Sequence, residues 1–359
     1  MTQAAQSVQI DEDKMNAFLG KVVGDFGATM SSMLAYIGTK LGLYQALADS
    51  EGGMTSNELA EKTGTNERYI REWLLNQAAG EYVHYDAVTG KYSMLPEQRI
   101  ALADESSPFY VAGGFYLVKA LLNAQPRITE AFKTGSGLGW HEHDTDLFLG
   151  TEKFFRPGYT AHLMGSWIPS LTGIQGKLEA GGRVADVGCG HGASTILMAQ
   201  AFPNSKFYGF DYHPNSIETA RKRAEGAGVS DRVTFEIATA KDYPDNQYDL
   251  IAFFDCLHDM GDPAGASKHA FDCLADGGSV MIVEPMAGNT VEENFNIVGR
   301  TFSAASALCC TPNAIAQGGT GIGTVATEDV IKKEVTSAAF GEFRRAAETP
   351  FNRVFEARK

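Results

Sequence analysis

The chain has 359 residues and a mass of 38.6 kDa, with 44 acidic against 30 basic side chains and a formal net charge of −14. This length is typical of two domains, and an apolar fraction of 44% excludes a chain that is disordered throughout. The acidic excess argues against nucleic-acid binding through phosphate contacts and against docking on an anionic membrane.

The cysteines and the N-terminus indicate where the protein works. The five cysteines contain no Cys-x-x-Cys pair, which is typical of reduced thiols rather than of disulfides or a zinc site. The first residues lack a basic stretch followed by an apolar one, so no signal peptide is predicted. No apolar run approaches the roughly 18 residues that span a bilayer. We therefore expect a cytoplasmic protein without a membrane partner.

The N-terminal third predicts a helical domain. Residues 1–14 are polar and expected to be frayed. Thr55 followed by Glu58 is a capping-box signature at a helix start, and Gly64 is a suitable end for that helix. Helical periodicity and hairpin signals place three helical regions and a hairpin over residues 15–48, 55–64, 65–79 and 82–94. This order is that of a winged-helix domain, which we place at residues 1–105.

A winged helix can contact DNA through its recognition helix, here predicted over residues 66–77. That helix carries Glu67, Arg68, Arg71 and Glu72, so its charges cancel. Binding to DNA phosphates needs a basic face. We therefore predict that the N-terminal domain forms a homodimer and does not bind nucleic acid.

Residues 106–175 alternate between helical and irregular patterns, and we expect a helical connector and a lid there. The stretch 140–146 places His141 and His143 beside carboxylates, but it lacks the further ligands of a tetrahedral site. The sequence therefore predicts no metal site. We expect His141, His143 and Phe155 to line the pocket of a small-molecule substrate.

From residue 176 to 359 short apolar runs alternate with helical stretches. This alternation predicts an α/β domain with a parallel sheet covered by helices on both faces, in a Rossmann-like arrangement. The last two runs, separated by Thr349-Pro350, predict an antiparallel hairpin at the sheet edge. The predicted strands cover residues 183–187, 206–210, 233–237, 248–254, 279–283, 343–348 and 352–356.

The strongest local signal is a strand that enters a glycine-rich turn and then a helix, over residues 184–197. The glycines allow a tight turn and a close approach of a ligand to the backbone. Gly188, Gly190 and Ala193 fit the dinucleotide pattern G-x-G-x-x-G/A, and Asp211 lies at the distance of a ribose-binding acid. This pattern alone allows an NAD(P)-dependent oxidoreductase.

Asp186 favours a different ligand. Two residues before the first glycine, its carboxylate would repel a pyrophosphate, whereas S-adenosylmethionine carries an ammonium, a sulfonium and no phosphate. The run Asp-x-Gly-x-Gly-x-Gly over residues 186–192 resembles the first motif of the class I S-adenosylmethionine-dependent methyltransferases. The resemblance implies that this cofactor binds at the turn and leaves as S-adenosylhomocysteine.

Later strand ends agree with this resemblance. It implies that Asp211 accepts hydrogen bonds from the ribose hydroxyls and that Tyr212 stacks on the adenine. Where the family has Asp-Ala at the adenine edge, this chain has Thr239-Ala240, which leaves a backbone contact. The resemblance further implies that Asp255 faces the methionine half of the cofactor. Tyr159 is a candidate contact for the cofactor carboxylate.

The run Cys256-Leu-His258-Asp259 and the strand end at Glu284 resemble the plant-type small-molecule O-methyltransferases, together with uncharacterised bacterial winged-helix methyltransferases. The resemblance implies that His258 is the general base for the acceptor hydroxyl and that Glu284 orients its imidazole. A second orienting glutamate belongs to the loop 318–323, which contains no acid here. The small and apolar residues of 302–312 imply a hydrophobic acceptor, and we expect Cys309 and Cys310 to pack in a core.

The sequence thus predicts a homodimeric methyltransferase that uses S-adenosylmethionine on a small, partly apolar molecule, with oxygen as the favoured acceptor atom. Two alternatives stay open. One is an NAD(P)-dependent oxidoreductase, and the other is a non-catalytic winged-helix regulator that senses S-adenosylmethionine.

Overall fold

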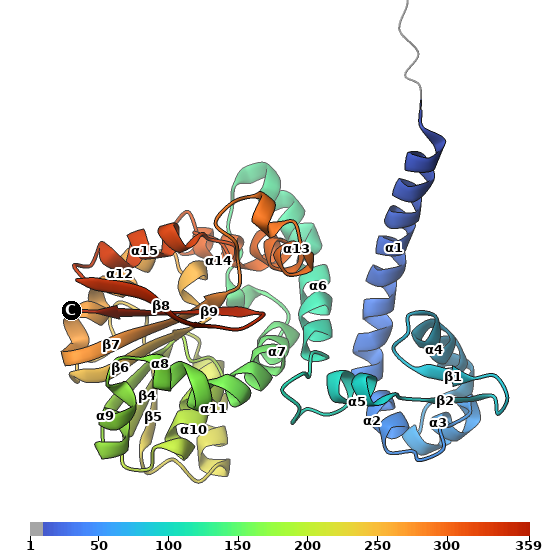
Figure 1. The fold of residues 1–359 in the computed structure, drawn as a ribbon, viewed down its shortest axis with the longest axis horizontal. Coiled ribbons are helices and arrows are strands. Elements are labelled where there is room, and N and C mark those ends of the chain that lie inside the picture. Colours follow the sequence, from blue (N-terminus) through green and yellow to red (C-terminus); the bar gives the residue numbers. More distant parts are fainter. Residues whose placement is uncertain (1–9) are drawn as a thin grey trace, which may run out of the picture. The chain divides into compact units, whose positions relative to one another are not determined.

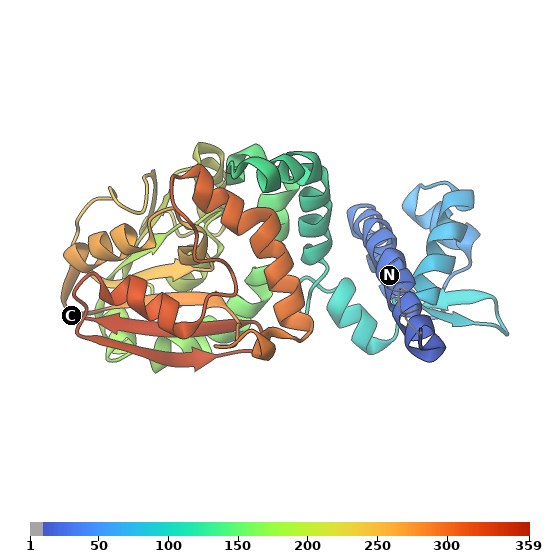
Figure 2. The same ribbon diagram turned by 90° about the horizontal axis from the view of Figure 1, so that it is seen from above.

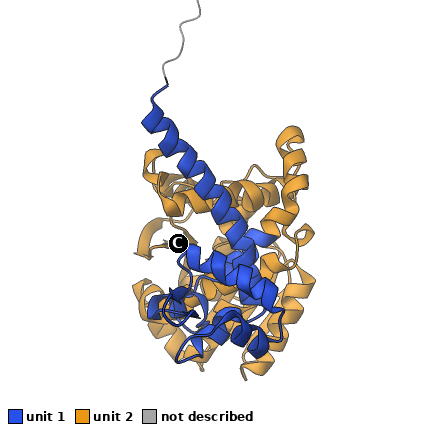
Figure 3. Ribbon diagram, turned by 90° about the vertical axis from the view of Figure 1, so that its right-hand side faces the viewer, with its two compact units in different colours: residues 1–119 blue, residues 120–359 orange. Residues whose placement is uncertain are grey.

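The computed structural model describes residues 10–359 (Figure 1, and in a second view Figure 2). Most of the stretch expected to be frayed, and the N-terminal residues examined for a signal peptide, lie outside the described residues. The chain divides into two compact units after Lys119 (Figure 3). The domain limits predicted at residues 105 and 175 remain predictions. Within residues 10–359, no helix is both long and apolar enough to cross a membrane.

The first unit begins with helix α1 (Glu12–Lys40). The Asp11 side chain accepts a hydrogen bond from the Lys14 amide at 3.1 Å, and two acidic residues occupy the first turn. A carboxylate cap and negative charge both stabilise a helix N-terminus. The expectation that residues 12–14 are frayed is therefore wrong.

The predicted winged helix is present in the rest of the first unit. The Thr55–Glu58 capping box is confirmed, with the Thr55 amide donating to Glu58 Oε2 at 2.7 Å, and Gly64 ends the helix at a φ of 64°. Tyr44 and Trp73 pack edge to face at 5.1 Å in its core. The elements are α2 (Leu43–Ala48), α3 (Ser56–Thr63), α4 (Glu67–Ala79), β1 (His84–Asp86), β2 (Lys91–Ser93) and α5 (Pro96–Leu102).

Helices precede the sheet of the second unit. Helix α6 (Gly113–Thr134) starts in the first unit, and the stretch expected to act as a lid is largely one helix, α7. After α6 the chain continues with η1 (Trp140–Glu142), α7 (Asp146–His162), η2 (Leu163–Trp167), α8 (Ile168–Ser170) and α9 (Ile174–Ala180).

A seven-stranded sheet organises the second unit, in the order β5-β4-β3-β6-β7-β9-β8. The first five strands of this order pair in parallel, and β9 and β8 are antiparallel at the edge, which confirms the predicted Rossmann-like fold and its C-terminal hairpin. The strands are β3 (Arg183–Val187), β4 (Lys206–Asp211), β5 (Val233–Ile237), β6 (Tyr248–Phe254), β7 (Leu274–Pro285), β8 (Glu342–Glu348) and β9 (Asn352–Arg358).

Helices cover both faces of this sheet (Figure 1). Helix α9 lies on one face with α10 (Ala193–Ala201) and α11 (Pro214–Gly226), while α12 (Pro263–Cys273) and α15 (Glu328–Thr336) lie on the other. Neighbouring strand residues serve opposite faces, since Val184 packs in one core and Ala185 in the other. A strand buried on both sides is largely apolar, which is why β6 is a continuous apolar run from Leu250 to Phe254.

Between β7 and α15 the chain forms a bent helical segment. Helix α13 (Ile297–Ala305) continues through the π-helical turn η5 (Ser306–Cys310) into α14 (Thr311–Ala316), as Figure 2 shows. Short helical turns η3 (Leu257–Asp259) and η4 (Glu292–Asn294) follow β6 and β7 respectively. The segment from α13 to α14 contributes to the cavity described next.

Candidate active site

A cavity of about 410 Å³ lies in the second unit, at the carboxyl ends of β3, β4 and β6. Ligands of open α/β sheets bind at such strand ends, where the strand order reverses. Of the predicted cofactor residues, the cavity is lined by Gly188, Gly190, Asp211, Tyr212, Thr239, Ala240, Asp255 and Tyr159.

The glycine turn forms one wall of this cavity with backbone that side chains would obstruct. Gly188, Gly190 and Gly192 all have positive φ, at 76°, 52° and 78°. A Cβ on Gly192 would lie 2.6 Å from the Phe235 ring, whereas a Cβ on Gly190 would meet no atom within 4 Å. Gly192 is therefore needed for packing, and Gly190 keeps backbone open to the cavity.

Asp186 lies fully buried at the end of β3, directly behind the turn. The hydroxyls of Ser194 and Thr195 both donate to its Oδ2 at 2.6 Å, while Oδ1 is buried and accepts no hydrogen bond from the described residues. Burial raises the pKa of Asp186 to about 6, although the two hydroxyls oppose this shift. A buried carboxylate oxygen without a donor is costly unless a ligand supplies one.

Asp211 ends β4 and ties the glycine turn to the neighbouring strand. Its Oδ2 accepts from the Gly190 amide at 2.9 Å and its Oδ1 from the His213 amide at 2.8 Å. Burial raises its pKa, against the effect of both amides. Tyr212 beside it is 41% exposed and lines the cavity, so its ring is available to a flat group.

Asp255 follows β6 with a φ of 51°, which is rare for a residue with a side chain. Tyr159 donates to its Oδ2 at 2.7 Å and the Asn352 amide nitrogen to its Oδ1 at 2.8 Å. Burial raises the pKa of Asp255 to about 8, partly offset by the hydrogen bond from Tyr159. The Tyr159 hydroxyl predicted to contact the cofactor therefore already has a carboxylate partner.

Helix α7 presents a stripe of side chains that the sequence analysis missed. Phe148 and Glu152 line the cavity with the predicted Phe155 and Tyr159, and the four residues follow the i, i+4, i+7, i+11 spacing of one helix face. The Phe148 ring stacks on His213 at 4.7 Å. This spacing is a signal in the sequence that could have revealed both residues.

His258 and Glu284 come together from the loop after β6 and the end of β7. His258 Nδ1 lies 2.6 Å from Glu284 Oε2, the His258 amide donates to Oε1 at 3.2 Å, and both side chains are buried. Burial by itself lowers the pKa of His258, but the charges of Glu284 and Cys310 outweigh it and raise the pKa well above its usual value. A carboxylate on Nδ1 leaves Nε2 as the nitrogen that can face another group.

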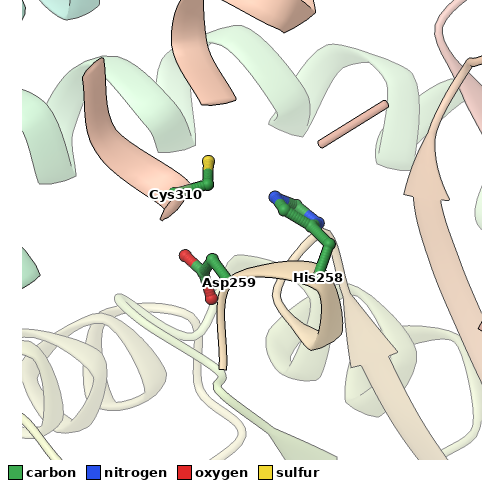
Figure 4. A group of neighbouring side chains, drawn as sticks. All are labelled: His258, Asp259 and Cys310. Atoms are coloured by element: carbon green, nitrogen blue, oxygen red, sulfur yellow. The ribbon is translucent and has the colours of Figure 1, made fainter. Parts of the chain in front are cut away.

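The loop 318–323 supplies no acid to this imidazole, and a thiol lies beside it instead. His258, Asp259 and Cys310 offer ligand-type atoms that all lie within 4.8 Å of one another (Figure 4). The hydrogen bond from Cys309 lowers the pKa of Cys310, and the His258 charge lowers it further against the effect of burial. Both cysteines are buried as predicted, but Cys310 also contacts polar groups, which core packing alone did not predict.

The two histidines of the predicted substrate pocket occupy different surroundings. His141 is exposed, lines the cavity and packs edge to face on Tyr212 at 6.2 Å. His143 is 8% exposed and outside the cavity lining, and neither ring nitrogen has a hydrogen-bond partner among residues 10–359. Burial lowers the pKa of His143. The sequence analysis missed Trp140 of η1, which also lines the cavity and whose Nε1 donates to Asp259 Oδ2 at 2.6 Å.

These residues fit S-adenosylmethionine better than a dinucleotide. The unpartnered Oδ1 of Asp186 is buried behind the turn, where a pyrophosphate would be repelled and a cationic group attracted. The open backbone at Gly190 leaves room for a ligand beside the turn.

The comparisons with known proteins agree with this geometry. A family model described as a methyltransferase domain matches residues 178–337, and one described as an Rv2258c-like winged HTH domain matches residues 28–103. The chain carries a methyltransferase domain. The prediction of a methyltransferase is confirmed at the level of this domain, and structures of the same fold have been solved with S-adenosylhomocysteine or S-adenosylmethionine bound.

Curated relatives match part of this chain. The 27-O-demethylrifamycin SV methyltransferase of Amycolatopsis mediterranei is 36% identical over 107 residues, which is 29% of this chain and 39% of that protein. Phosphoethanolamine N-methyltransferase 1 of Arabidopsis thaliana is 38% identical over 108 residues, or 30% and 21% of the two chains. The chain thus spans well under half the length of these relatives.

Solved structures match over almost the whole chain. A putative O-methyltransferase of Nostoc punctiforme has a TM-score of 0.71 at 20% identity, covering 96% of this chain and 98% of that one. Human N-acetylserotonin methyltransferase, solved in complex with S-adenosylmethionine, has a TM-score of 0.67 at 16% identity and 99% coverage of both chains. These likenesses confirm the fold. The oxidoreductase and regulator alternatives receive no support from these matches.

Proposed function

We propose that this protein transfers a methyl group from S-adenosylmethionine to an oxygen of a small, partly apolar molecule, with His258 as the proton acceptor. The observation that carries the proposal is the buried His258–Glu284 pair at 2.6 Å. Neither residue belongs to the cavity lining, but Asp259, the neighbour of His258 in the chain, does. A neutral hydroxyl is a weak nucleophile until it loses its proton, whereas a neutral amine can attack through its lone pair first, so a buried base favours a hydroxyl as the acceptor.

The proposed binding of the cofactor rests on the acidic residues at the strand ends. Asp186 would attract the cationic methionine half of the cofactor through its unpartnered Oδ1. Asp211 and Tyr212 would hold the ribose and the adenine, and the Thr239-Ala240 backbone the adenine edge. When bound, S-adenosylmethionine supplies a methyl group activated by its sulfonium. Asp255, held by Tyr159 and Asn352, keeps a polar wall at the end of β6.

The proposed removal of the acceptor's proton rests on His258. Its Nδ1–H donates to Glu284, and in the neutral ring Nε2 accepts the proton of the acceptor hydroxyl; the raised pKa makes this neutral ring a stronger base. The imidazolium that forms is stabilised by the Glu284 carboxylate, so the pair both orients the ring and supports the charge. Such positioned proton transfer contributes about 10²- to 10⁴-fold to a rate.

The proposed class of acceptor rests on the residues that line the cavity. Trp140, Phe148 and Phe155 line it, and Phe155 stacks on Tyr159 at an interplanar angle of 14°. Aromatic walls favour a flat or apolar ligand, and a few polar groups orient it. His141 at the mouth of the cavity supports a polar end on the acceptor.

We also propose that the protein is a homodimer through its N-terminal domain. The C-terminal part of α1 packs on α4, where Trp73 Nε1 donates to the Leu34 carbonyl at 2.8 Å. The N-terminal part of α1 leaves Phe18, Phe26 and Met30 more than 60% exposed. Continuous exposed apolar surface of this kind is typical of an interface. On α4, Arg71 pairs with Glu67 at 2.6 Å, which supports a role other than DNA binding.

A binding titration and a product search test the function in turn. Calorimetry with S-adenosylhomocysteine and with NADH is expected to show binding of the first and none of the second. Incubation with methyl-labelled S-adenosylmethionine and a metabolite extract is then expected to yield a labelled small molecule by mass spectrometry. The His258→Ala variant should bind S-adenosylhomocysteine normally and lose at least about 10²-fold in product formation. Full activity of this variant would refute the proton-acceptor role.

A further inference from the structure

The corner of the second unit around His258 contains a second cluster of polar side chains, which shares His258 with the proposed proton acceptor and adds Asp259 and Cys310. His258 and Asp259 belong to η3 after β6, and Cys310 is the last residue of the π-helical turn η5. Figure 4 shows the three side chains around one small space. All three residues are buried, with exposed fractions of 3%, 7% and 8%.

We propose that His258, Asp259 and Cys310 form a binding site for a divalent transition-metal ion of the zinc class. Their imidazole nitrogen, carboxylate oxygen and thiol sulfur lie within 4.8 Å of one another. Ligand atoms around a tetrahedral zinc are separated by about 3.5 Å, which small side-chain rotations would reach. Thiolate and imidazole ligands favour zinc over magnesium or calcium, which require oxygen ligands.

The surroundings of the three ligands support a metal rather than a chance cluster. Metal-bound histidines typically donate their other ring nitrogen to a carboxylate, and Glu284 Oε2 lies 2.6 Å from His258 Nδ1. Trp140 Nε1 donates to Asp259 Oδ2 at 2.6 Å, while Oδ1 accepts no hydrogen bond from the residues of the described chain. Each of these two ligands is therefore held by one neighbour and keeps one atom for the ion.

The backbone that positions Cys310 gives an independent sign. The turn Ser306–Cys310 is π-helical inside an otherwise α-helical segment, and such turns are frequent at functional sites. Asn313 on the next turn donates to the Asp259 carbonyl at 2.9 Å, which joins α14 to η3. The helix and the loop that supply the ligands are thus attached to each other.

Three protein ligands leave a fourth coordination position, which is the pattern of catalytic rather than structural zinc. Asp259 lines the cavity, so this position can be reached by an acceptor oxygen or sulfur. A bound ion would lower the pKa of such a group and would occupy the His258 nitrogen that otherwise accepts a proton. The use in catalysis rests on the proposed function, whereas the ligand set does not.

Metal retention by the purified full-length chain tests the site directly. After dialysis against micromolar Zn²⁺ and gel filtration, about one zinc per chain is expected by elemental analysis, and Co²⁺ should give a thiolate-to-metal absorption band. Cys310→Ser and Asp259→Asn should weaken zinc affinity by at least about tenfold. Cys309→Ser is the matched control, because Cys309 is an adjacent buried thiol outside the ligand set.

The control and the cofactor titration keep the outcomes separate. Calorimetry with S-adenosylhomocysteine should give the wild-type affinity for Cys309→Ser and Cys310→Ser, whose side chains lie outside the cavity lining, which shows that both variants are folded. Zinc retention that is absent in the wild-type chain, or lost equally in Cys309→Ser and Cys310→Ser, would overturn the metal site. Methyl transfer by a zinc-free wild-type chain would leave the proposed function intact, whereas zinc binding without methyl transfer would leave only the site.

Discussion

The imidazole of His258 and the carboxylate of Glu284 are 26 residues apart in the chain and 2.6 Å apart in the structure. They meet because β6 and β7 are parallel neighbours whose carboxyl ends lie at the same edge of the sheet. The backbone amide of Asp255 donates to the Val283 carbonyl at 2.8 Å and thereby aligns the two strand ends. The pair is therefore a product of strand register rather than of local sequence.

Removing the charge of Glu284 should separate two effects of this residue, which are orientation of the His258 imidazole and stabilisation of its positive charge. We expect Glu284→Gln to lower kcat by about 10- to 100-fold, since a neutral amide still reaches Nδ1 but no longer stabilises the imidazolium. KM and the affinity for S-adenosylhomocysteine should stay near the wild-type values. Steady-state kinetics with the identified acceptor and calorimetry measure these quantities. A loss confined to KM would contradict the proposed role.

Cofactor binding should depend on pH through Asp186. Burial raises the pKa of this carboxyl to about 6, with the Ser194 and Thr195 hydroxyls lowering it and the Asp211 charge raising it. Below that pH the neutral acid cannot attract a cation, so affinity for S-adenosylmethionine should fall as pH decreases from about 7 to about 5, by up to about tenfold per unit. Above pH 7 it should level off.

Asp186→Asn is the control for this dependence. It should weaken binding at pH 7 and flatten most of the profile, leaving the smaller part that Asp211 contributes. Calorimetric titrations across the pH range measure both effects. A variant with the wild-type profile would show that another group titrates.

Two glycines of one turn should respond differently to alanine. Gly192→Ala would place a Cβ 2.6 Å from the Phe235 ring at a φ of 78°, so we expect destabilisation of about 2–4 kcal/mol. Gly190→Ala meets no atom within 4 Å and should cost only about 1–2 kcal/mol for its positive φ. The new methyl group would point into open space beside the cavity, so its main effect should be on binding.

Denaturant unfolding and S-adenosylhomocysteine titration distinguish these outcomes. Gly190→Ala should lose at least about tenfold in affinity while remaining folded. Wild-type affinity in this variant would place the ligand away from the turn.

The exposed apolar residues of α1 should carry self-association. We expect the double variant Phe18→Ser, Phe26→Ser to convert a dimer into a monomer in sedimentation velocity, because both side chains are more than 60% exposed on this helix. Phe132→Ser is the matched control, since Phe132 is 73% exposed in the second unit. A dimer that survives the α1 changes would contradict the proposed interface.

Features set by neighbours in the chain could be predicted from the sequence. The Thr55–Glu58 capping box and the Gly64 helix end involve residues within one or two turns of each other. The glycine turn likewise follows from the conformational freedom of three closely spaced residues. The parallel sheet followed from the alternation of strands and helices, since parallel strands require crossover helices, whereas the order of its strands comes from the structure alone.

Other features depend on which side chains the fold brings together across long separations. The α7 stripe was visible in its helical spacing, but its placement along the cavity depends on how the helix packs on the sheet. Cys310 read as a core residue from its apolar neighbours, and only the π-helical turn and the packing of α14 bring it to His258 and Asp259. Contacts of this kind are set by helix packing and strand register, which no short stretch of sequence contains. The net charge of −14 could be read from the sequence, and it argued against nucleic acids and anionic membranes as partners. The raised pKa values of Asp186 and Asp255 depend on the tertiary structure, because burial in the folded interior causes them.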